Sequence, residues 1–288
     1  MPDLSPLYTL LAHALPFDCL QTRFMQQALV GLLLLAPMAA TMGIMVVNFR
    51  MAFFADAISH SAFAGVALGL IFSVDPNLTM PMFGLLVGLG IMILQRHSSL
   101  SSDTVICVFF SAMIAFGLAI VSRDRTLARD LQRFLYGDIL TISDPQILCL
   151  LVLFLVFMTF QVMSYNHLLY IGLNPTLAQA HRIRVAAHQY IFAGLLALIV
   201  MFSVQAVGVL LVTAMLIVPA AAARNVARSA GAMFWWALLF SISSAIIGLI
   251  ISAQDWARTA TGATIIMVAC GWFLASLAVS TLRKEQTV

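Results

Sequence analysis

The chain has 288 residues, of which 62% are hydrophobic and only 9% are charged, and its formal net charge is +3. A soluble domain of this size carries roughly 25% charged residues. The composition therefore excludes a water-soluble globular protein and predicts a protein whose solvent is lipid. The small, scattered positive charge also gives no basis for nucleic-acid binding.

Nine apolar segments follow one another along the chain, and crossing a bilayer takes about 20 apolar residues. Only Gln205 and Ala206 divide the sixth segment from the seventh, so eight crossings are an alternative. The sequence thus predicts an all-α, polytopic integral membrane protein. We expect one transmembrane domain over residues 1–288, with residues 1–23 as an interfacial N-terminal segment. In chain order, the predicted segments are Phe24–Val47, Phe53–Val74, Leu78–Leu94, Val105–Val121, Ile147–Met163, Tyr190–Val204, Val207–Ala223, Phe234–Ser252 and Ala263–Leu282.

The second segment carries two ionisable residues four positions apart, Asp56 and His60. On a helix this spacing puts both side chains on one face. A carboxylate and an imidazole so placed can hold two positions of a divalent cation. An ionisable residue within a membrane segment is costly and is a functional candidate. The alternative is that Asp56 complements the helix dipole and His60 is a packed, hydrogen-bonded histidine.

Small and polar residues surround this pair on the same segment. Ser59 and Ser61 either support the two ligands or hydrogen-bond to a neighbouring helix. Gly65 and Gly69 form a GxxxG pattern, which lets another helix approach closely, within the chain or in a dimer.

The loop after the fifth segment has its own pattern, running from Asn174 to Arg182. Asn-Pro starts a turn, and the residues that follow can form one or two helical turns. The segment is interpreted either as a short amphipathic helix that docks on a partner or as an ordinary polar loop.

Several kinds of chemistry find no support in the sequence. The single lysine, Lys284, lies four residues from the C-terminus, so no P-loop lysine is available to hold nucleotide phosphates. The cysteines lack metal-ligand spacing, and no nucleophile–base pair suggests a membrane enzyme. The other histidines after the first segment lie at segment ends or in loops, which argues against haem; they are His97, His167, His181 and His188.

At these residues the sequence resembles the membrane permease subunits of ABC importers for zinc, manganese and iron(II). The resemblance covers nearly the whole chain after about residue 24. Four motifs in the order found in that family carry it: Arg50–Ala67, Phe134–Leu140, Val207–Val212 continuing through Ile217–Arg224, and Thr261–Thr264.

The resemblance implies a type II importer permease that moves divalent metal ions, Zn²⁺ first and then Mn²⁺ or Fe²⁺, into the cytoplasm. It implies a multi-pass protein of the bacterial inner membrane that has a cytoplasmic C-terminus and no permanently bound cofactor. The partners would be a second copy of the chain, membrane lipid, cytoplasmic ATPase subunits that hydrolyse ATP, and an extracytoplasmic metal-binding protein. Asp56 and His60 match the family positions implicated in metal passage. The ATPase-coupling residues would be Asn174, Pro175, Ala178 and Arg182.

Two positions depart from the family pattern. Arg182 stands where relatives usually have glycine, which predicts a different local turn and a partner-specific ATPase contact. Cys107 replaces another glycine, which puts tight packing at that position in doubt.

The sequence leaves alternatives for the orientation of the chain in the membrane and for its function. With the N-terminus outside, eight Lys and Arg residues fall inside and six outside, a weak bias that an arginine-rich loop over Ser122–Pro145 opposes. The resemblance favours this orientation nevertheless. The rival functions are a stand-alone secondary metal transporter driven by an ion gradient, a membrane enzyme, and a permease for a larger metal chelate.

Overall fold

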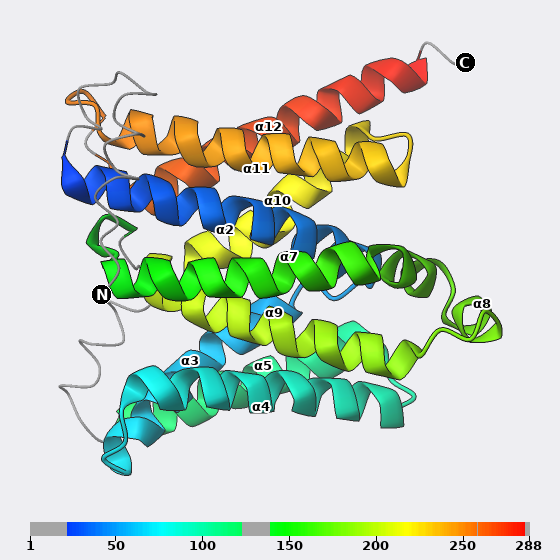
Figure 1. Ribbon diagram of the computed structural model, residues 1–288, viewed down its shortest axis with the longest axis horizontal. Coiled ribbons are helices and arrows are strands. Elements are labelled where there is room, and N and C mark those ends of the chain that lie inside the picture. The colour runs from blue at the N-terminus through cyan, green and yellow to red at the C-terminus, as the bar shows by residue number, and fades with distance from the viewer. Residues whose placement is uncertain (1–21, 123–138, 258, 286–288) are drawn as a thin grey trace.

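The computed structural model describes residues 22–122, 139–257 and 259–285, and these form an all-helical bundle (Figure 1). The long helices lie side by side along the long axis, and the short helix α8 lies at one end, called here the α8 end. The elements are α2 (Arg23–Asn48), α3 (Phe54–Ile71), α4 (Pro76–His97), α5 (Ser102–Val121), η2 (Ile139–Thr141), α7 (Asp144–Leu173), α8 (Pro175–Ala180), α9 (Val185–Val207), α10 (Val209–Val226), α11 (Ala230–Ser252) and α12 (Thr261–Glu285).

The predicted membrane segments all appear as helices in the described part of the chain. Eight helices are long and apolar enough to cross a membrane, and α3, with 18 residues, is a further long apolar helix packed among them. Both α9 and α10 belong to the eight, so neither is too short to cross. Of the predicted N-terminal segment, residues 1–21 lie outside the described residues, and Arg23 is already the first residue of α2.

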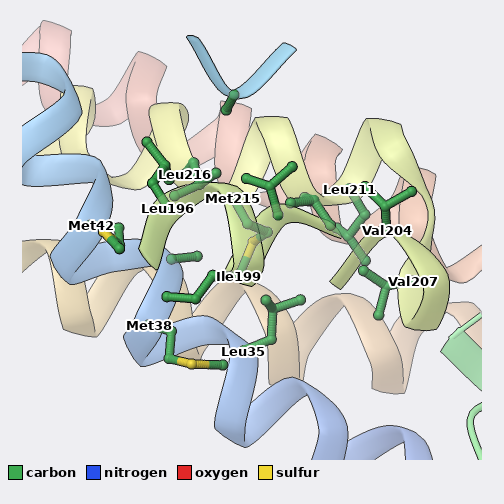
Figure 2. Packing of buried hydrophobic residues seen from close by; sticks show 14 of the residues in the cluster. Leu35, Met38, Met42, Leu196, Ile199, Val204, Val207, Leu211, Met215 and Leu216 are labelled. Carbon is green, nitrogen blue, oxygen red and sulfur yellow. The ribbon is translucent and has the colours of Figure 1, made fainter. Parts of the chain in front are cut away.

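The core is centred on α2, which packs against α7, α10 and α11. Figure 2 shows Met38 and Met42 of α2 among side chains of α9 and α10. Both methionines are fully buried. The flexible, polarisable methionine side chain fills irregular gaps between helices. Packing therefore accounts for these two methionines of α2.

Close approaches between helices explain three glycines. A Cβ atom on Gly43 would collide with the carbonyl oxygen of Leu216, so α2 and α10 touch at this position. A Cβ atom on Gly65 would lie 2.9 Å from the Met80 Cα atom, and one on Gly69 would meet the Thr79 side chain. The GxxxG pattern is thus used within the chain, between α3 and α4.

The link between α9 and α10 is the single residue Gly208. Its φ of 86° and ψ of 162° lie in a region that only glycine adopts without strain. Figure 1 shows the chain turning back here, so that α10 returns toward the α8 end. This one residue therefore sets the direction in which α10 leaves α9.

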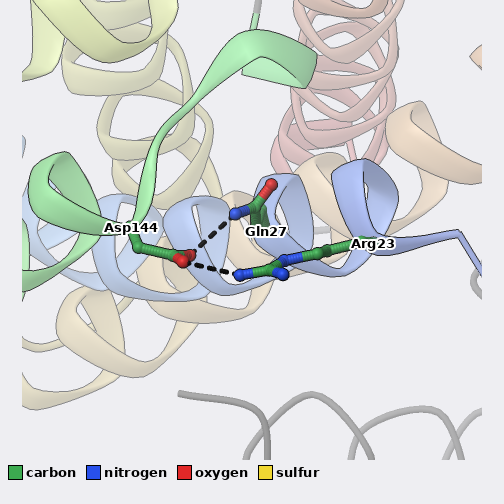
Figure 3. A network of polar contacts seen from close by, with 3 residues as sticks. All are labelled: Arg23, Gln27 and Asp144. Atoms are coloured by element: carbon green, nitrogen blue, oxygen red, sulfur yellow. Dashed lines mark hydrogen bonds and ion pairs between the residues drawn. The ribbon is translucent and has the colours of Figure 1, made fainter. Parts of the chain in front are cut away.

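A polar contact ties α2 to α7 at the end of the bundle away from α8. Asp144 accepts from Arg23 Nη2 at 2.8 Å and from Gln27 Nε2 at 2.7 Å (Figure 3). The Arg23 side chain is 70% exposed, so this ion pair stabilises the fold only weakly.

Candidate metal site

Asp56 and His60 lie in the first two turns of α3 and are both half-buried. They share one helix face and attract each other electrostatically. The imidazole of His60 also packs edge-on against Phe63 and Phe110, with ring centroids 5.7 Å and 5.1 Å away. The two aromatic rings limit the movement of the imidazole, which keeps it beside the carboxylate.

A third polar group, Thr213 of α10, completes the site from another helix. The Thr213 side chain lies near enough to the Asp56 carboxylate to interact with it electrostatically. Its hydroxyl donates to the Leu210 carbonyl oxygen of its own helix at 3.4 Å. Sequence reasoning missed Thr213, although it is the one hydroxyl residue within an otherwise apolar run from Val207 to Pro219.

The neighbouring serines do not support the pair. Ser61 Oγ donates to the Ile58 carbonyl oxygen of its own helix at 2.6 Å. Ser59 Oγ is fully buried and has no hydrogen-bond partner among the described residues. Neither serine therefore orients Asp56 or His60.

The site offers a metal ion few protein ligands. Among the described residues, no group of three or more His, Cys, Asp or Glu side chains could hold a metal ion together. A carboxylate and an imidazole are both ligands for Zn²⁺ and similar dications. The asymmetric set, one charged and one neutral ligand, thus suits weak binding of a dication. Asp56 also stands in the first turn of α3, where its charge would complement the helix dipole.

The predicted coupling segment forms the helix α8. Asn174 caps it by accepting from the Thr176 and Leu177 amides at 3.0 Å and 3.3 Å. Pro175 occupies the first turn, where a missing N–H costs nothing. Ala178 is fully buried against the bundle and anchors the helix there.

Arg182 follows α8 and has a φ of 58°. This left-handed conformation is the one that glycine favours. The arginine thus occupies a glycine-type backbone conformation, so its presence does not force the different turn that we expected. The other departing residue, Cys107, is exposed on α5.

Of the remaining motifs, residues 134–138 lie outside the described part of the chain, and Ile139 and Leu140 belong to η2.

Comparison with known proteins now identifies the family. The sequence profile described as "ABC 3 transport family" matches residues 21–280. The chain belongs to this family. The predicted family and the all-helical membrane fold are both confirmed.

Related proteins align with about nine-tenths of the chain. The chain is 32% identical over 250 residues to the high-affinity zinc uptake system membrane protein ZnuB of Haemophilus influenzae, covering 87% of this chain and 95% of that protein. It is 29% identical to the manganese import system permease protein ScaB of Streptococcus parasanguinis, covering 92% of this chain and 94% of the relative. The solved structure of PsaBC from Streptococcus pneumoniae in complex with Fab is similar, with a TM-score of 0.77 and 30% sequence identity. The match covers 90% of this chain and 93% of the chain in that structure.

Proposed function

We propose that this chain is the membrane permease subunit of an ABC importer that moves divalent metal ions across the bacterial inner membrane, with Zn²⁺ as the first candidate and Mn²⁺ or Fe²⁺ next. The observation that carries the proposal is the pairing of Asp56 and His60 on one face of α3. Thr213 adds a polar group from α10. Family membership and the names of the zinc and manganese relatives support it.

The ligand chemistry explains the order of the candidate metals. An imidazole suits borderline ions such as Zn²⁺, whereas Mn²⁺ is better served by oxygen ligands. Asp56 supplies the negative charge that offsets part of the cost of moving a dication into a low-dielectric region. With two protein ligands, the ion keeps other positions for water, so it can be passed on.

The single chain leaves surfaces exposed that partners would cover. The apolar helices α5 and α12 are mostly unburied, and lipid and a second copy of the chain would cover them. The exposed residues of α8, together with Arg182 just after it, would dock on a separate cytoplasmic ATPase that hydrolyses ATP. An extracytoplasmic protein would deliver the metal at the opposite end. The end of α12, which lies on the α8 side of the bundle, would then face the cytoplasm.

Uptake of ⁶⁵Zn²⁺ and ⁵⁴Mn²⁺ into vesicles that hold this chain, its ATPase and its binding protein tests the proposal. We expect ATP-dependent uptake that Asp56→Ala and His60→Ala both abolish. Asp103→Ala is the matched control, because Asp103 also stands in the first turn of a long helix but has no histidine one turn on. Equal uptake by the Asp56 variant and this control would favour the helix-dipole interpretation and refute the site. Uptake that does not depend on ATP or the ATPase would indicate a secondary transporter.

A further inference from the structure

Two histidines far apart in sequence meet near the α8 end. His167 lies on α7 and His188 in the first turn of α9, and their ring centroids are 5.0 Å apart with planes inclined by 70°. The helix α7 has 30 residues and is about 45 Å long, longer than the roughly 30 Å hydrocarbon layer. His167, six residues before the end of α7, therefore lies close to the membrane surface, within reach of water.

The separation of the two rings fits coordination of one metal ion. An imidazole nitrogen binds Zn²⁺ at about 2.0–2.1 Å, so two rings on a tetrahedral or octahedral ion have centroids about 5 Å apart. Two helices supply the two ligands, as is usual for metal sites built in helical bundles. No rearrangement of the backbone is needed to bring the rings to this distance.

The orientation of His188 is fixed by a backbone hydrogen bond. Its Nδ1 lies 3.0 Å from the Arg184 carbonyl oxygen, which can only accept. Nδ1 therefore carries a hydrogen, which leaves Nε2 as the nitrogen that can bind a metal ion. Metal-binding histidines are commonly held in this way, with one nitrogen bonded to a carbonyl and the other to the metal.

We propose that His167 and His188 form a second divalent-metal site, separate from Asp56 and His60. A metal ion there ties α7 to α9 at the base of α8, the segment that joins these two helices. This restraint would slow uptake when cytoplasmic Zn²⁺ is plentiful, a consequence that rests on the proposed function. Binding is weak and reversible, because there are two protein ligands and Arg182 and Arg184 lie close in the sequence.

Zn²⁺ binding to the purified chain in detergent tests the site. The parent is the double variant Asp56→Ala, His60→Ala, titrated with Zn²⁺ against a chelating indicator. We expect one Zn²⁺ per chain, and a loss of affinity of about tenfold or more in His167→Ala and in His188→Ala. His188→Phe keeps a ring beside His167 but removes the ligand, so it should also fail to bind while remaining monodisperse.

His97→Ala is the matched control, because His97 Nδ1 also contacts a carbonyl oxygen, that of Ile93, at 2.9 Å. It should bind as the parent does. Zn²⁺ should also slow hydrogen exchange of the α8 amides about tenfold in the parent and leave them unchanged in His188→Ala. Absence of Zn²⁺ binding in the parent, or binding that survives both histidine substitutions, would overturn this site without touching the proposed transport function, which depends on Asp56 and His60.

Discussion

The Gly208→Ala substitution tests how strongly one residue determines the path of α10. At φ 86° and ψ 162°, an alanine Cβ would be held in a backbone region that is essentially restricted to glycine. Such a conformation costs about 1–3 kcal/mol. Because 1.4 kcal/mol is a factor of ten in an equilibrium constant, the folded fraction should fall by roughly five- to a hundredfold relative to the unfolded one.

The strain at position 208 would also reach the proposed metal site. The helix α10 begins at the next residue, and Thr213 stands one turn later beside Asp56. Relaxation of the alanine toward an allowed conformation would redirect the first turn of α10 and move the Thr213 hydroxyl. We therefore expect Zn²⁺ uptake per folded molecule to fall as well.

The assay is the thermal midpoint of the detergent-solubilised chain, followed by the amount that remains monodisperse after heating. Gly271→Ala is the matched control, since a Cβ there meets nothing within 4 Å inside α12. In that helix interior, alanine should stabilise by about 0.5–1 kcal/mol. Equal midpoints for Gly208→Ala and the unsubstituted chain would refute the reasoning, because the strain would then be absorbed elsewhere at no cost.

Four further substitutions probe other parts of the chain. Gly65→Leu should push α3 off α4 and destabilise by roughly 1–3 kcal/mol, seen as a lower thermal midpoint. Asn174→Ala removes the acceptor of two α8 amides and should cost about 1 kcal/mol locally, measured as faster hydrogen exchange in α8. Arg182→Gly should relieve about 1–2 kcal/mol of left-handed strain and raise the thermal midpoint. Arg23→Ala should change the midpoint by less than about 1 kcal/mol, because its ion pair with Asp144 is exposed.

Hydropathy located the helices of this chain but not their ends. The fifth predicted segment, Ile147–Met163, is the middle of a helix that runs from Asp144 to Leu173. Its last turns contain polar and aromatic residues, which lower the hydropathy without lowering the tendency to form a helix. The helix ends at Leu173 because the next residue, Asn174, precedes a proline, which disfavours a helical backbone. Asn174 is extended, with φ −158° and ψ 108°.

The sequence predicted which side chains share a face of one helix, but not which residues of different helices come into contact. Asp56 and His60 are four residues apart on α3, so their shared face followed from helical geometry alone. Thr213 lies near Asp56 although the two are 157 residues apart in the sequence. His167 meets His188 although a short helix lies between them in the chain. Such pairings depend on how helices pack and on a turn as small as Gly208. A polar residue inside an apolar segment was the available signal for Thr213.

Sites with two protein ligands are what passage of a metal ion requires. A structural zinc site gains about 10–16 kcal/mol, and the upper end of that range corresponds to a dissociation constant near 10⁻¹² M. With association steered to about 10⁸ M⁻¹ s⁻¹, such a site would release its ion roughly once in 10⁴ s. A dissociation constant of about 10⁻⁵ M at the same association rate gives release about 10³ times per second. The proposed Asp56–His60 site has no third carboxylate, histidine or cysteine clustered with it among the described residues, so it would release its ion rapidly. A third strong ligand engineered at Thr213, as Thr213→Asp, should therefore tighten Zn²⁺ binding and slow uptake, and faster uptake by that variant would show that ion capture, not release, limits the permease.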